Sequence, residues 1–358
     1  MSRETVLVAM SGGVDSSVAA ALLVERGHRV IGATMKTFCY SETASHGRTC
    51  CGLDGIMDAR RVADHLGIPH YVFDMEESFG NAVMDDFVAE YVAGRTPNPC
   101  VRCNSNTKIP DLLRRGRALG ADRIATGHFA RLRRDEAGAP KLLRGVDDRK
   151  DQSYFLWGVP AAILGRLSFP VGELTKSEVR ARARDLGLTT AEKPESQEIC
   201  FVPTDDYTDF LTDRLGADHP ALNAGRLVTP TGEAVGEHAG YARYTVGQRK
   251  GLGGGFGRRL YVLGVRPADN EVVVGDAAEL TRDEVLLGDV NWLAEPPSKG
   301  ERVTVRLRHR GALVPAEVVT TGDVGIRLHL EEPQRAVTPG QSGAIYRGEV
   351  LAGGGRIR

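Results

Sequence analysis

The sequence predicts an α/β fold: a doubly wound parallel sheet, followed by a small central β-rich domain and a C-terminal β-barrel. Strand and helix patterns alternate from Thr5 to about Thr126, which is typical of parallel strands joined by helices. After about Asp205 the composition becomes glycine-rich, and from about Val272 short alternating strands follow one another. The chain has 358 residues, enough for two or three domains, and we expect them to span residues 1–204, 205–272 and 273–358.

The first strand and the first helix flank a turn of small residues. The run Thr5–Ala9 is apolar and rich in β-branched residues, as in a buried strand, and the apolar segment from Val14 predicts a helix that ends before Gly27. Because the turn lies at a helix N-terminus, its backbone N–H groups and the helix dipole favour a bound anion. The alternation continues with strands expected over 29–35, 69–73 and 122–126, and helices over 55–66, 76–91 and 111–119.

The turn reads Ser11-Gly12-Gly13-Val14-Asp15-Ser16-Ser17. It is not a P-loop of the GxxxxGK[ST] type, because no Lys follows the glycines, and it is not a GxGxxG loop. Its pattern is similar to the pyrophosphate loop (PP-loop) of the ATP pyrophosphatases, enzymes with an adenine nucleotide alpha hydrolase-like fold that split ATP between the α and β phosphates. The alternative is a glycine-capped turn in an unrelated doubly wound domain. Ligands of such sheets gather at the carboxyl ends of the strands, where Met35 and Gly127 also fall.

The charge of the whole chain does not indicate a nucleic-acid-binding protein. Its formal net charge is −1, so an RNA surface must be a local patch. Residues 113–150 hold eleven Lys and Arg against five Asp and Glu, a local net charge of +6. Residues 238–268 hold six Lys and Arg, four aromatic residues and no acid, a mixture suited to phosphate contacts and base stacking. A solvated basic face is the simpler interpretation of both segments.

The cysteines are expected to be reduced. The sequence has no signal peptide and no apolar run approaching 18 residues, which predicts a cytoplasmic protein without a membrane partner. Thiols in that compartment are better interpreted as ligands or nucleophiles than as disulfides. A capping box at Thr175–Glu178 predicts a helix to about Leu186, and residues 187–203 are expected to form a loop or edge segment that carries Cys200.

Cys100 and Cys103 lie in the segment Thr96–Asn104, where two prolines and two asparagines predict a shaped loop rather than a helix interior. A structural zinc site would need a second spaced pair, and a redox pair would need a different βα context. In a third interpretation Cys103 is a nucleophile with Cys200 as its partner, and Arg102 lowers a thiol pKa. In a variant of it, Cys100, Cys103 and Cys200 bind a [4Fe–4S] cluster. Buried or spare thiols are the default for Cys39, Cys50 and Cys51.

Taken together, the motifs resemble those of the bacterial tRNA-specific 2-thiouridylases, the MnmA/TrmU family, along nearly the whole chain. A set of this length, in order, is far more specific than any single member. The matching stretches are Met10–Ser17, Thr96–Pro99 with Cys103-Asn104, Ala125–His128, Lys150–Phe155, Ser196–Phe201, Tyr244–Gly253 and Pro339–Ser342.

The resemblance implies ATP-dependent 2-thiolation of the wobble uridine, position 34, in the anticodon stem-loop of tRNA. Cys200 would carry the sulfur as a persulfide, received from a cysteine desulfurase or a sulfur-relay protein, and Cys103 would be the partner thiol that closes a disulfide with it. ATP would lie on Ala9, Met10, Ser11, Gly12, Gly13, Val14, Asp15 and Ser16, with Met35 and Gly127 near the adenine. Asn98, Pro99 and Cys100 would contact the target base, and His128, Lys150, Asp151, Gln152, Arg308, His309 and Gln341 would touch the tRNA.

Magnesium is expected to bridge the phosphates, with Asp15 nearby. One residue departs from the family: much of the family has Asp at the position of Cys100, and a third thiol favours the cluster variant. The persulfide relay remains the first hypothesis. Two other classes of function stay open. One is a PP-loop enzyme that acts on a small molecule, and the other is a non-catalytic RNA-binding protein with a zinc or iron–sulfur site.

Overall fold

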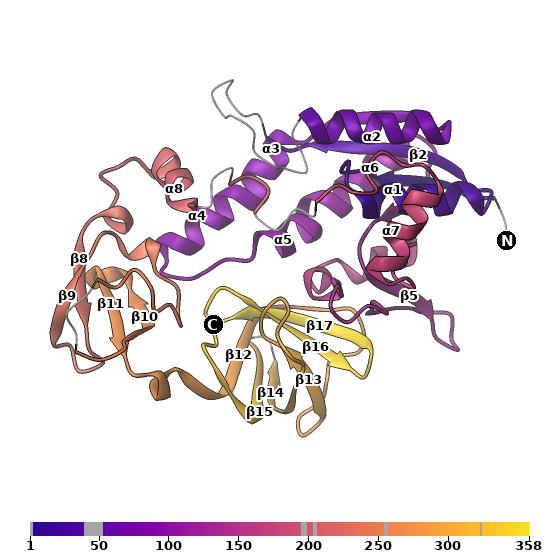
Figure 1. The fold of residues 1–358 in the computed structure, drawn as a ribbon. Helices are drawn as coiled ribbons and strands as arrows, with labels where there is room; N and C mark the ends of the chain where they lie inside the picture. Colours follow the sequence, from indigo (N-terminus) through magenta and orange to yellow (C-terminus); the bar gives the residue numbers. More distant parts are fainter. Residues whose placement is uncertain (1–2, 39–52, 195–198, 203–205, 254–256, 323) are drawn as a thin grey trace.

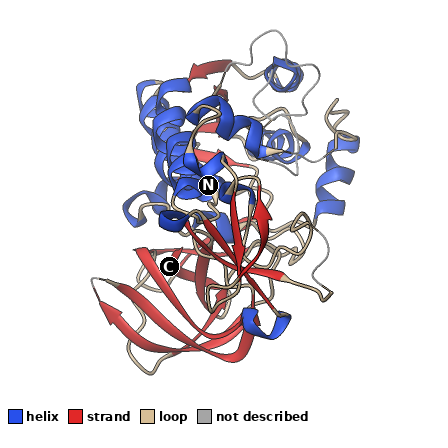
Figure 2. Cartoon of the chain, turned by 90° about the vertical axis from the view of Figure 1, so that its left-hand side faces the viewer, coloured by secondary structure: helices blue, strands red, loops and turns tan. Residues whose placement is uncertain are grey.

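The fold is described from a computed structural model, which covers residues 3–38, 53–194, 199–202, 206–253, 257–322 and 324–358 (Figure 1). The strands of these residues form a parallel sheet, a small mixed sheet and a large antiparallel sheet that closes into a barrel. Figure 2 shows most helices above and the barrel strands below. The predicted fold class is therefore confirmed.

The N-terminal sheet has five parallel strands in the order β3-β2-β1-β4-β7. β1 is central, and its Val6 lies opposite Val30 of β2 on one side and Arg123 of β4 on the other. Because all five strands run the same way, the loops that follow them emerge at one edge of the sheet. The strands are β1 Thr5–Ala9, β2 Arg29–Lys36, β3 His70–Asp74, β4 Arg123–Thr126 and β7 Leu167–Ser168.

Helices cover both faces of this sheet. Along β1, Val6 and Val8 join a core with α1, α2 and α7, whereas Leu7 and Ala9 join a core with α6 on the opposite face. Burial on both faces explains why β1 is a continuous apolar run rather than an alternating one. None of the helices among the described residues is both long and apolar enough to cross a membrane. The helices named here are α1 Val14–Glu25, α2 Leu53–Leu66, α6 Ile109–Ala118 and α7 Lys176–Asp185.

The helix predicted over 76–91 contains a π-helical turn. It consists of α3 Glu76–Phe79, the π segment η1 Gly80–Met84 and α4 Asp85–Val92.

The segment around Cys100 and Cys103 is helical, so the predicted loop is wrong. Asn98 is the N-cap of α5 (Pro99–Arg102), where its side chain accepts a hydrogen bond from the Val101 N–H, and Pro99 takes the first helical position. Asn and Pro are favoured at these two positions because they satisfy or remove N–H groups that the helix leaves without partners. The π segment η2 (Cys103–Lys108) then leads into α6.

The central sheet has the strand order β10-β11-β8-β9 and shares a core with α3 and α4. Aromatic rings join the two parts: Phe87 of α4 contacts Phe201 edge-on at 5.2 Å, and Tyr91 stacks on Tyr207 at 4.5 Å. The segment that carries Cys200 is thereby anchored by its neighbour Phe201. The elements are α8 Tyr207–Leu215, β8 Gly225–Val228, β9 Ala234–His238, β10 Tyr261–Arg266 and β11 Glu271–Gly275.

The C-terminal sheet closes into a barrel because β12 pairs with both β15 and β17. Two strands from the N-terminal half extend it: β6 pairs with β17 at Leu143 and Val350, and β5 pairs with β6. The strands are β5 Ala130–Arg134, β6 Pro140–Arg144, β12 Thr281–Trp292, β13 Arg302–Arg306, β14 Val314–Gly322, β15 Gly325–Arg335, β16 Ser342–Arg347 and β17 Val350–Ile357. Short 3₁₀ turns lie at η3 Ser153–Leu156, η4 Ala161–Arg166, η5 Pro220–Leu222, η6 Tyr241–Arg243, η7 Pro267–Asp269 and η8 Ala277–Leu280.

The substitution Leu7→Ala should destabilise the protein by about 2–5 kcal/mol, because it leaves a cavity in a fully buried position of the central strand. Leu53→Ala is the matched control, since Leu53 is 81% exposed and its truncation should change the free energy of unfolding by less than about 0.5 kcal/mol. Urea unfolding of both variants measures the difference. Equal destabilisation by the two substitutions would contradict the described packing of β1.

Candidate active site

The loops after β1, β2 and β4 open into one cavity of about 450 Å³, a volume in the range of small-molecule sites. α5, the segment around Cys200, and His309 from the barrel form its other walls. Of the residues predicted to bind ATP, Ala9, Met10, Ser11, Asp15, Ser16, Met35 and Gly127 line this cavity. Of the other predicted site residues, Pro99, Cys100, Cys103, His128, Lys150, Gln152, Cys200 and His309 line it as well.

The glycine turn is shaped by its own hydroxyl groups. The Ser16 hydroxyl accepts from the Ser11 N–H at 3.2 Å and donates to the Gly13 carbonyl at 3.0 Å. Gly12 adopts φ +70°, and a Cβ there would lie 2.2 Å from the Gly55 carbonyl oxygen, so only glycine fits. The predicted residues Gly12, Gly13 and Val14 thus shape the turn and the start of α1 without lining the cavity wall.

A lysine from a distant helix reaches the turn. Lys176 Nζ donates to both carboxylate oxygens of Asp15, at 2.7 and 2.8 Å, and lies 5.6 Å from the centre of the Phe129 ring. The predicted capping box is confirmed: Thr175 and Glu178 cap α7 reciprocally, which places Lys176 at the first helical position. The contact between Lys176 and Asp15 was not predicted from the sequence. The available signal was a Lys in the first turn of a helix, where the helix dipole disfavours a positive charge.

Three thiols belong to the cavity wall. Cys100 is exposed, whereas Cys103 and Cys200 are partly buried and pack against the aromatic core that joins α4 to the central sheet. No group of three or more His, Cys, Asp or Glu side chains within the described ranges is arranged to hold a metal ion. The expectations for Cys39, Cys50 and Cys51 concern residues outside the described part of the chain.

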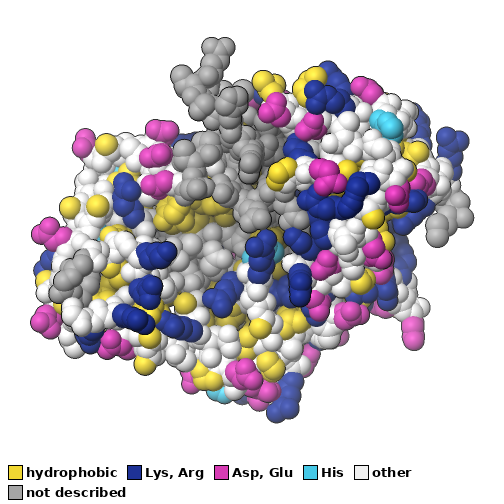
Figure 3. All heavy atoms as spheres, viewed as in Figure 1, with side chains coloured by type: hydrophobic (Ala, Val, Ile, Leu, Met, Phe, Trp, Pro, Cys, Tyr) yellow, Lys and Arg dark blue, Asp and Glu magenta, His cyan; other side chains and the backbone are white. Residues whose placement is uncertain are grey.

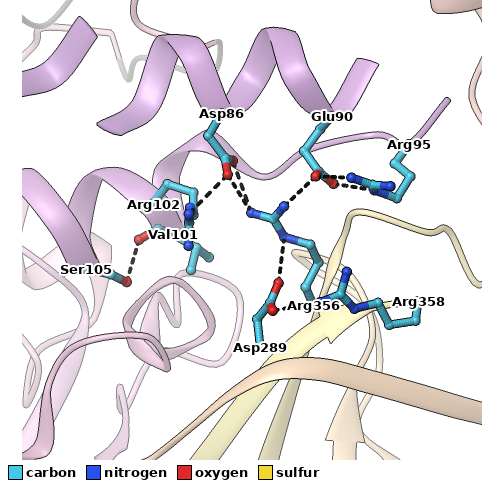
Figure 4. Close-up of polar contacts among 9 residues, drawn as sticks. All are labelled: Asp86, Glu90, Arg95, Val101, Arg102, Ser105, Asp289, Arg356 and Arg358. Atoms are coloured by element: carbon cyan, nitrogen blue, oxygen red, sulfur yellow. Dashed lines mark hydrogen bonds and ion pairs between the residues drawn. The ribbon is translucent and has the colours of Figure 1, made fainter. Parts of the chain in front are cut away.

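Arg102, expected to lower a thiol pKa, forms an ion pair with α4. Its guanidinium Nη2 lies 3.1 Å from the Asp86 carboxylate of α4, so its charge is paired (Figure 4). The expected effect of Arg102 on a thiol pKa stays a prediction.

His128 and Gln152 are held in the cavity wall by hydrogen bonds. His128 Nδ1 and the Thr126 hydroxyl are 2.7 Å apart, and the Gln152 side-chain oxygen accepts from the Phe129 N–H at 3.0 Å. Desolvation, and then the charge of Lys108, lower the pKa of His128 well below its ordinary value. His128 is therefore neutral at pH 7 and serves as a hydrogen-bonding group rather than a cation.

Four of the residues expected to touch the tRNA or its target base lie outside the cavity wall. The Asp151 carboxylate is buried and accepts from Arg306 at 2.7 Å and from the N–H of Gly145 at 3.0 Å. Gln341 Nε2 donates to the carbonyls of Thr96 and Pro97, at 3.1 and 3.0 Å. Asn98 caps α5, and Arg308 is exposed beside His309, whose ring lies 4.5 Å from that of Phe155.

Basic residues outside the predicted set of site residues also line the cavity, namely Lys108, Arg149 and Arg310. Figure 3 shows Lys and Arg side chains gathered across the middle of one face of the molecule. Much of the basic charge of 113–150 is neutralised elsewhere, for example by the Arg131–Glu349 pair at 2.7 Å and the Arg123–Glu4 pair at 2.9 Å. Arg149 and Lys150 are the part of that segment that the fold brings to the cavity.

Comparison with known proteins decides the family. Residues 4–204 match the family described as the tRNA methyl transferase HUP domain, residues 208–276 its PRC-barrel domain and residues 282–357 an aminomethyltransferase beta-barrel domain. A tRNA-specific 2-thiouridylase MnmA from Geotalea uraniireducens is 49% identical over 99% of this chain and 95% of its own length. The MnmA of Geobacter metallireducens is 48% identical over 99% and 97%. The chain belongs to the MnmA family of tRNA-specific 2-thiouridylases. As an MnmA family member it is an enzyme.

Among solved structures, NMN synthetase from Francisella tularensis is similar over 60% of this chain and 72% of its own, with a TM-score of 0.36 and 17% identity. This likeness is too low to inform the function of an MnmA family member.

The titration of His128 tests the described cavity wall. The pKa of His128 is lowered in the folded protein, so near pH 6.5 the unfolded chain binds a proton at this residue and the folded protein does not. The contribution of His128 to stability is therefore complete above pH 6.5 and declines as the pH falls toward the folded pKa. Histidine NMR resonances, assigned with His128→Gln, should show no midpoint for His128 between pH 6 and 8. The variant should also lose less stability on acidification, by at most about 1.4 kcal/mol per pH unit. A midpoint near 6.5 would contradict the neutral assignment.

Proposed function

We propose that this enzyme catalyses ATP-dependent 2-thiolation of the wobble uridine, position 34, of tRNA. The observation that carries the proposal is that the PP-loop and the thiols of Cys103 and Cys200 line the same cavity. One bound base could then have its C2 oxygen activated by ATP and receive sulfur from a thiol without leaving the cavity. The HUP domain implies ATP use, and we assign catalysis to residues 1–204 and RNA contacts to parts of 205–272 and 273–358 as well.

The loop residues account for the activation step. A uracil carbonyl is a poor electrophile, and transfer of the adenylyl group to its C2 oxygen makes AMP the leaving group while pyrophosphate departs. The N–H groups at the start of α1 suit the phosphates, and Met35 and Gly127, which line the same cavity, would meet the adenine. Magnesium would be carried by the phosphates, with Asp15 nearby, where Lys176 orients its carboxylate through bonds to both oxygens. It would supply charge neutralisation of the pyrophosphate.

The two thiols account for the sulfur step. The terminal sulfur of a Cys200 persulfide attacks C2, and the C2–O bond to AMP breaks with its electron pair leaving on AMP. The Cys103 thiolate then attacks the inner sulfur of Cys200, so the S–S bond breaks toward the sulfur on C2 and a Cys103–Cys200 disulfide forms. A cellular thiol reduces this disulfide before the next turnover. A cysteine desulfurase or a sulfur-relay protein would recharge Cys200.

The relay is favoured over a [4Fe–4S] cluster. The described residues include no three-ligand group of Cys, His or acids, although Cys100, Cys103 and Cys200 all line the cavity. We therefore assign no step to a cluster, and we place Cys100 beside the target base together with Asn98 and Pro99.

The basic residues around the cavity suit the RNA. Lys108, Arg149, Lys150 and Arg310 line it without a comparable number of acids, Asp15 being the one carboxylate among the lining residues described. A wobble base must turn out of the anticodon loop to reach a buried site, which costs less from single-stranded RNA than from a duplex. His128 and Gln152 offer neutral hydrogen-bonding groups for such a base, and the buried Asp151 holds the segment that presents Lys150 and Gln152.

Substitution of either relay thiol should abolish product. Cys103→Ser and Cys200→Ser should reduce 2-thiouridine formation at least 1,000-fold, because serine neither carries a persulfide nor attacks one. Cys100→Ser is the matched control and should retain activity within about tenfold if no cluster is needed. Product is measured by mass spectrometry of nucleosides from tRNA, with iron and sulfide quantified in anaerobically purified enzyme. Wild-type levels of product from both relay variants would refute the proposal, and loss of product together with iron in Cys100→Ser would replace the relay by the cluster.

Binding of tRNA should depend on arginines of the central domain. Arg249, Arg258 and Arg259 surround a surface hollow, and Arg258 is paired with Asp276 at 2.9 Å. The double variant Arg249→Ala, Arg259→Ala removes the other two charges. The plot of the logarithm of the tRNA association constant against the logarithm of the salt concentration should then become less steep by roughly 1.4–1.8, about 0.7–0.9 for each lost phosphate contact. Arg26→Ala is the control, because Arg26 caps the end of α1 that points away from the cavity. An unchanged slope in the double variant would exclude this surface.

A further inference from the structure

A cluster of ion pairs joins the last strand of the barrel to α4 (Figure 4). Arg356 of β17 donates from Nη2 to both oxygens of Asp86, at 2.9 and 3.1 Å, and its Nη1 lies 2.6 Å from Glu90. The Arg356 side chain is 13% exposed and that of Glu90 is 5% exposed. The two parts of the fold therefore meet through charges that are largely removed from water.

Each of the two acids holds a second arginine. Asp86 also pairs with Arg102 at 3.1 Å, and Glu90 accepts from Arg95 Nε at 2.8 Å. Arg95 and Arg102 are the residues that flank the segment 96–101, and Arg102 directly precedes Cys103. The barrel arginine is thus connected, through two adjacent turns of α4, to both ends of the segment that brings the Cys103 thiol to the cavity.

The start of the same segment is clamped by the other two parts of the fold. The Thr96 N–H donates to the Pro339 carbonyl at 2.9 Å, and the Thr96 hydroxyl donates to that of Thr245 in the central part at 3.0 Å. Gly340 has φ +91°, and a Cβ on it would lie 2.7 Å from the Thr96 carbonyl oxygen. With the two hydrogen bonds from Gln341, residues 95–97 are held by α4, the barrel and the central part of the fold.

The electrostatics indicate that this cluster serves geometry more than stability. Burial would raise the pKa of Glu90, but the hydrogen bond from Arg95 and the charge of Arg356 outweigh it and hold the pKa below its ordinary value. Glu90 is thus charged at neutral pH while nearly buried. Buried ion pairs seldom repay the cost of removing both charges from water, so a network of this kind is a weak source of stability and a strong constraint on orientation.

We propose that Arg356 is a positioning residue for Cys103. Its bonds to Asp86 and Glu90 hold α4, and through Arg95 and Arg102 hold segment 95–102, so that the Cys103 thiol faces the cavity at the start of η2. Arg356 itself does not line the cavity and touches no reacting atom. The assignment concerns the placement of Cys103, and it rests on the proposed function only where thiolation is the readout.

The substitution Arg356→Met tests the proposal, because methionine keeps much of the side-chain length and removes every bond to Asp86 and Glu90. Arg347→Met is the matched control: Arg347 lies on the neighbouring strand β16 and pairs with Glu301 of the same barrel at 2.6 Å. In Arg356→Met the kcat of tRNA thiolation should fall at least tenfold, with KM for ATP and tRNA within threefold. In Arg347→Met both constants should stay within threefold of the parent. A kcat within threefold in folded Arg356→Met would overturn the proposal, as would an equal fall in the control.

Alkylation of Cys103 by iodoacetamide, followed by peptide mass spectrometry, gives a readout that does not depend on the reaction. Its rate should change at least threefold in Arg356→Met and stay constant in Arg347→Met, and a constant rate in both would count against the proposal. Should Arg356→Met fail to fold, Glu90→Gln takes its place, since it keeps the side-chain size and the Arg356–Asp86 bonds, and the same two readouts apply. Altered alkylation in an enzyme whose parent makes no 2-thiouridine would retain the positioning role and reject the proposed function.

Discussion

The parallel pairing of β1 with β2 and β4 is the constraint on which the rest of the molecule depends. Strands that run in one direction deliver their following loops to one edge, so the glycine turn after Ala9, Met35 and Gly127 meet at one cavity although they lie far apart in the sequence. The approach is close, because a Cβ on Gly127 would lie 2.6 Å from the Ser16 nitrogen. Burial of β1 on both faces leaves this edge as the accessible end of the sheet.

The thiols come from outside that sheet and depend on the other two parts of the fold. Cys103 begins a π-helical segment, an arrangement frequent at functional sites, and the helix before it starts at a segment that the barrel and the central sheet both hold. Cys200 lies beside Phe201, which packs edge-on against Phe87 of α4. The same helix α4 therefore supports both thiols, one through charges and one through aromatic contacts.

Charged residues near the site form ion pairs with residues that are close in the fold but distant in the sequence. Asp15 has Lys176 as a partner 161 residues away, and Arg131 has Glu349 as a partner 218 residues away. Arg123, Arg131 and Arg133 of the basic run over 113–150 pair with distant acids in this way, and of that run the cavity receives its last members, Arg149 and Lys150. A net charge near zero for the whole chain is thus compatible with a locally basic site.

Features that depend on local spacing could be predicted from the residues alone. The alternation of apolar runs predicted the parallel sheet, S-G-G-x-D-S-S predicted an anion site at a helix N-terminus, and Thr175–Glu178 predicted a capped helix, because each of these patterns acts within a few residues of the chain. The short helix α5 also had a local signal, an Asn–Pro pair at the N-cap (Asn98) and first helical position (Pro99). That signal was misinterpreted as a loop.

Which distant groups meet depends on how the whole chain packs. This packing pairs Arg102 with Asp86 of α4, turns Gln341 inward onto the 96–97 carbonyls, and adds β5 and β6 to the barrel sheet. Ion pairs and side-chain hydrogen bonds have a reach of a few ångströms but no preferred separation along the chain, so their partners follow from packing and leave no periodic trace in the sequence. The fold class and the loop that suits ATP could therefore be predicted from the residues alone, whereas Lys176 and Arg356 became visible only when the chain was folded.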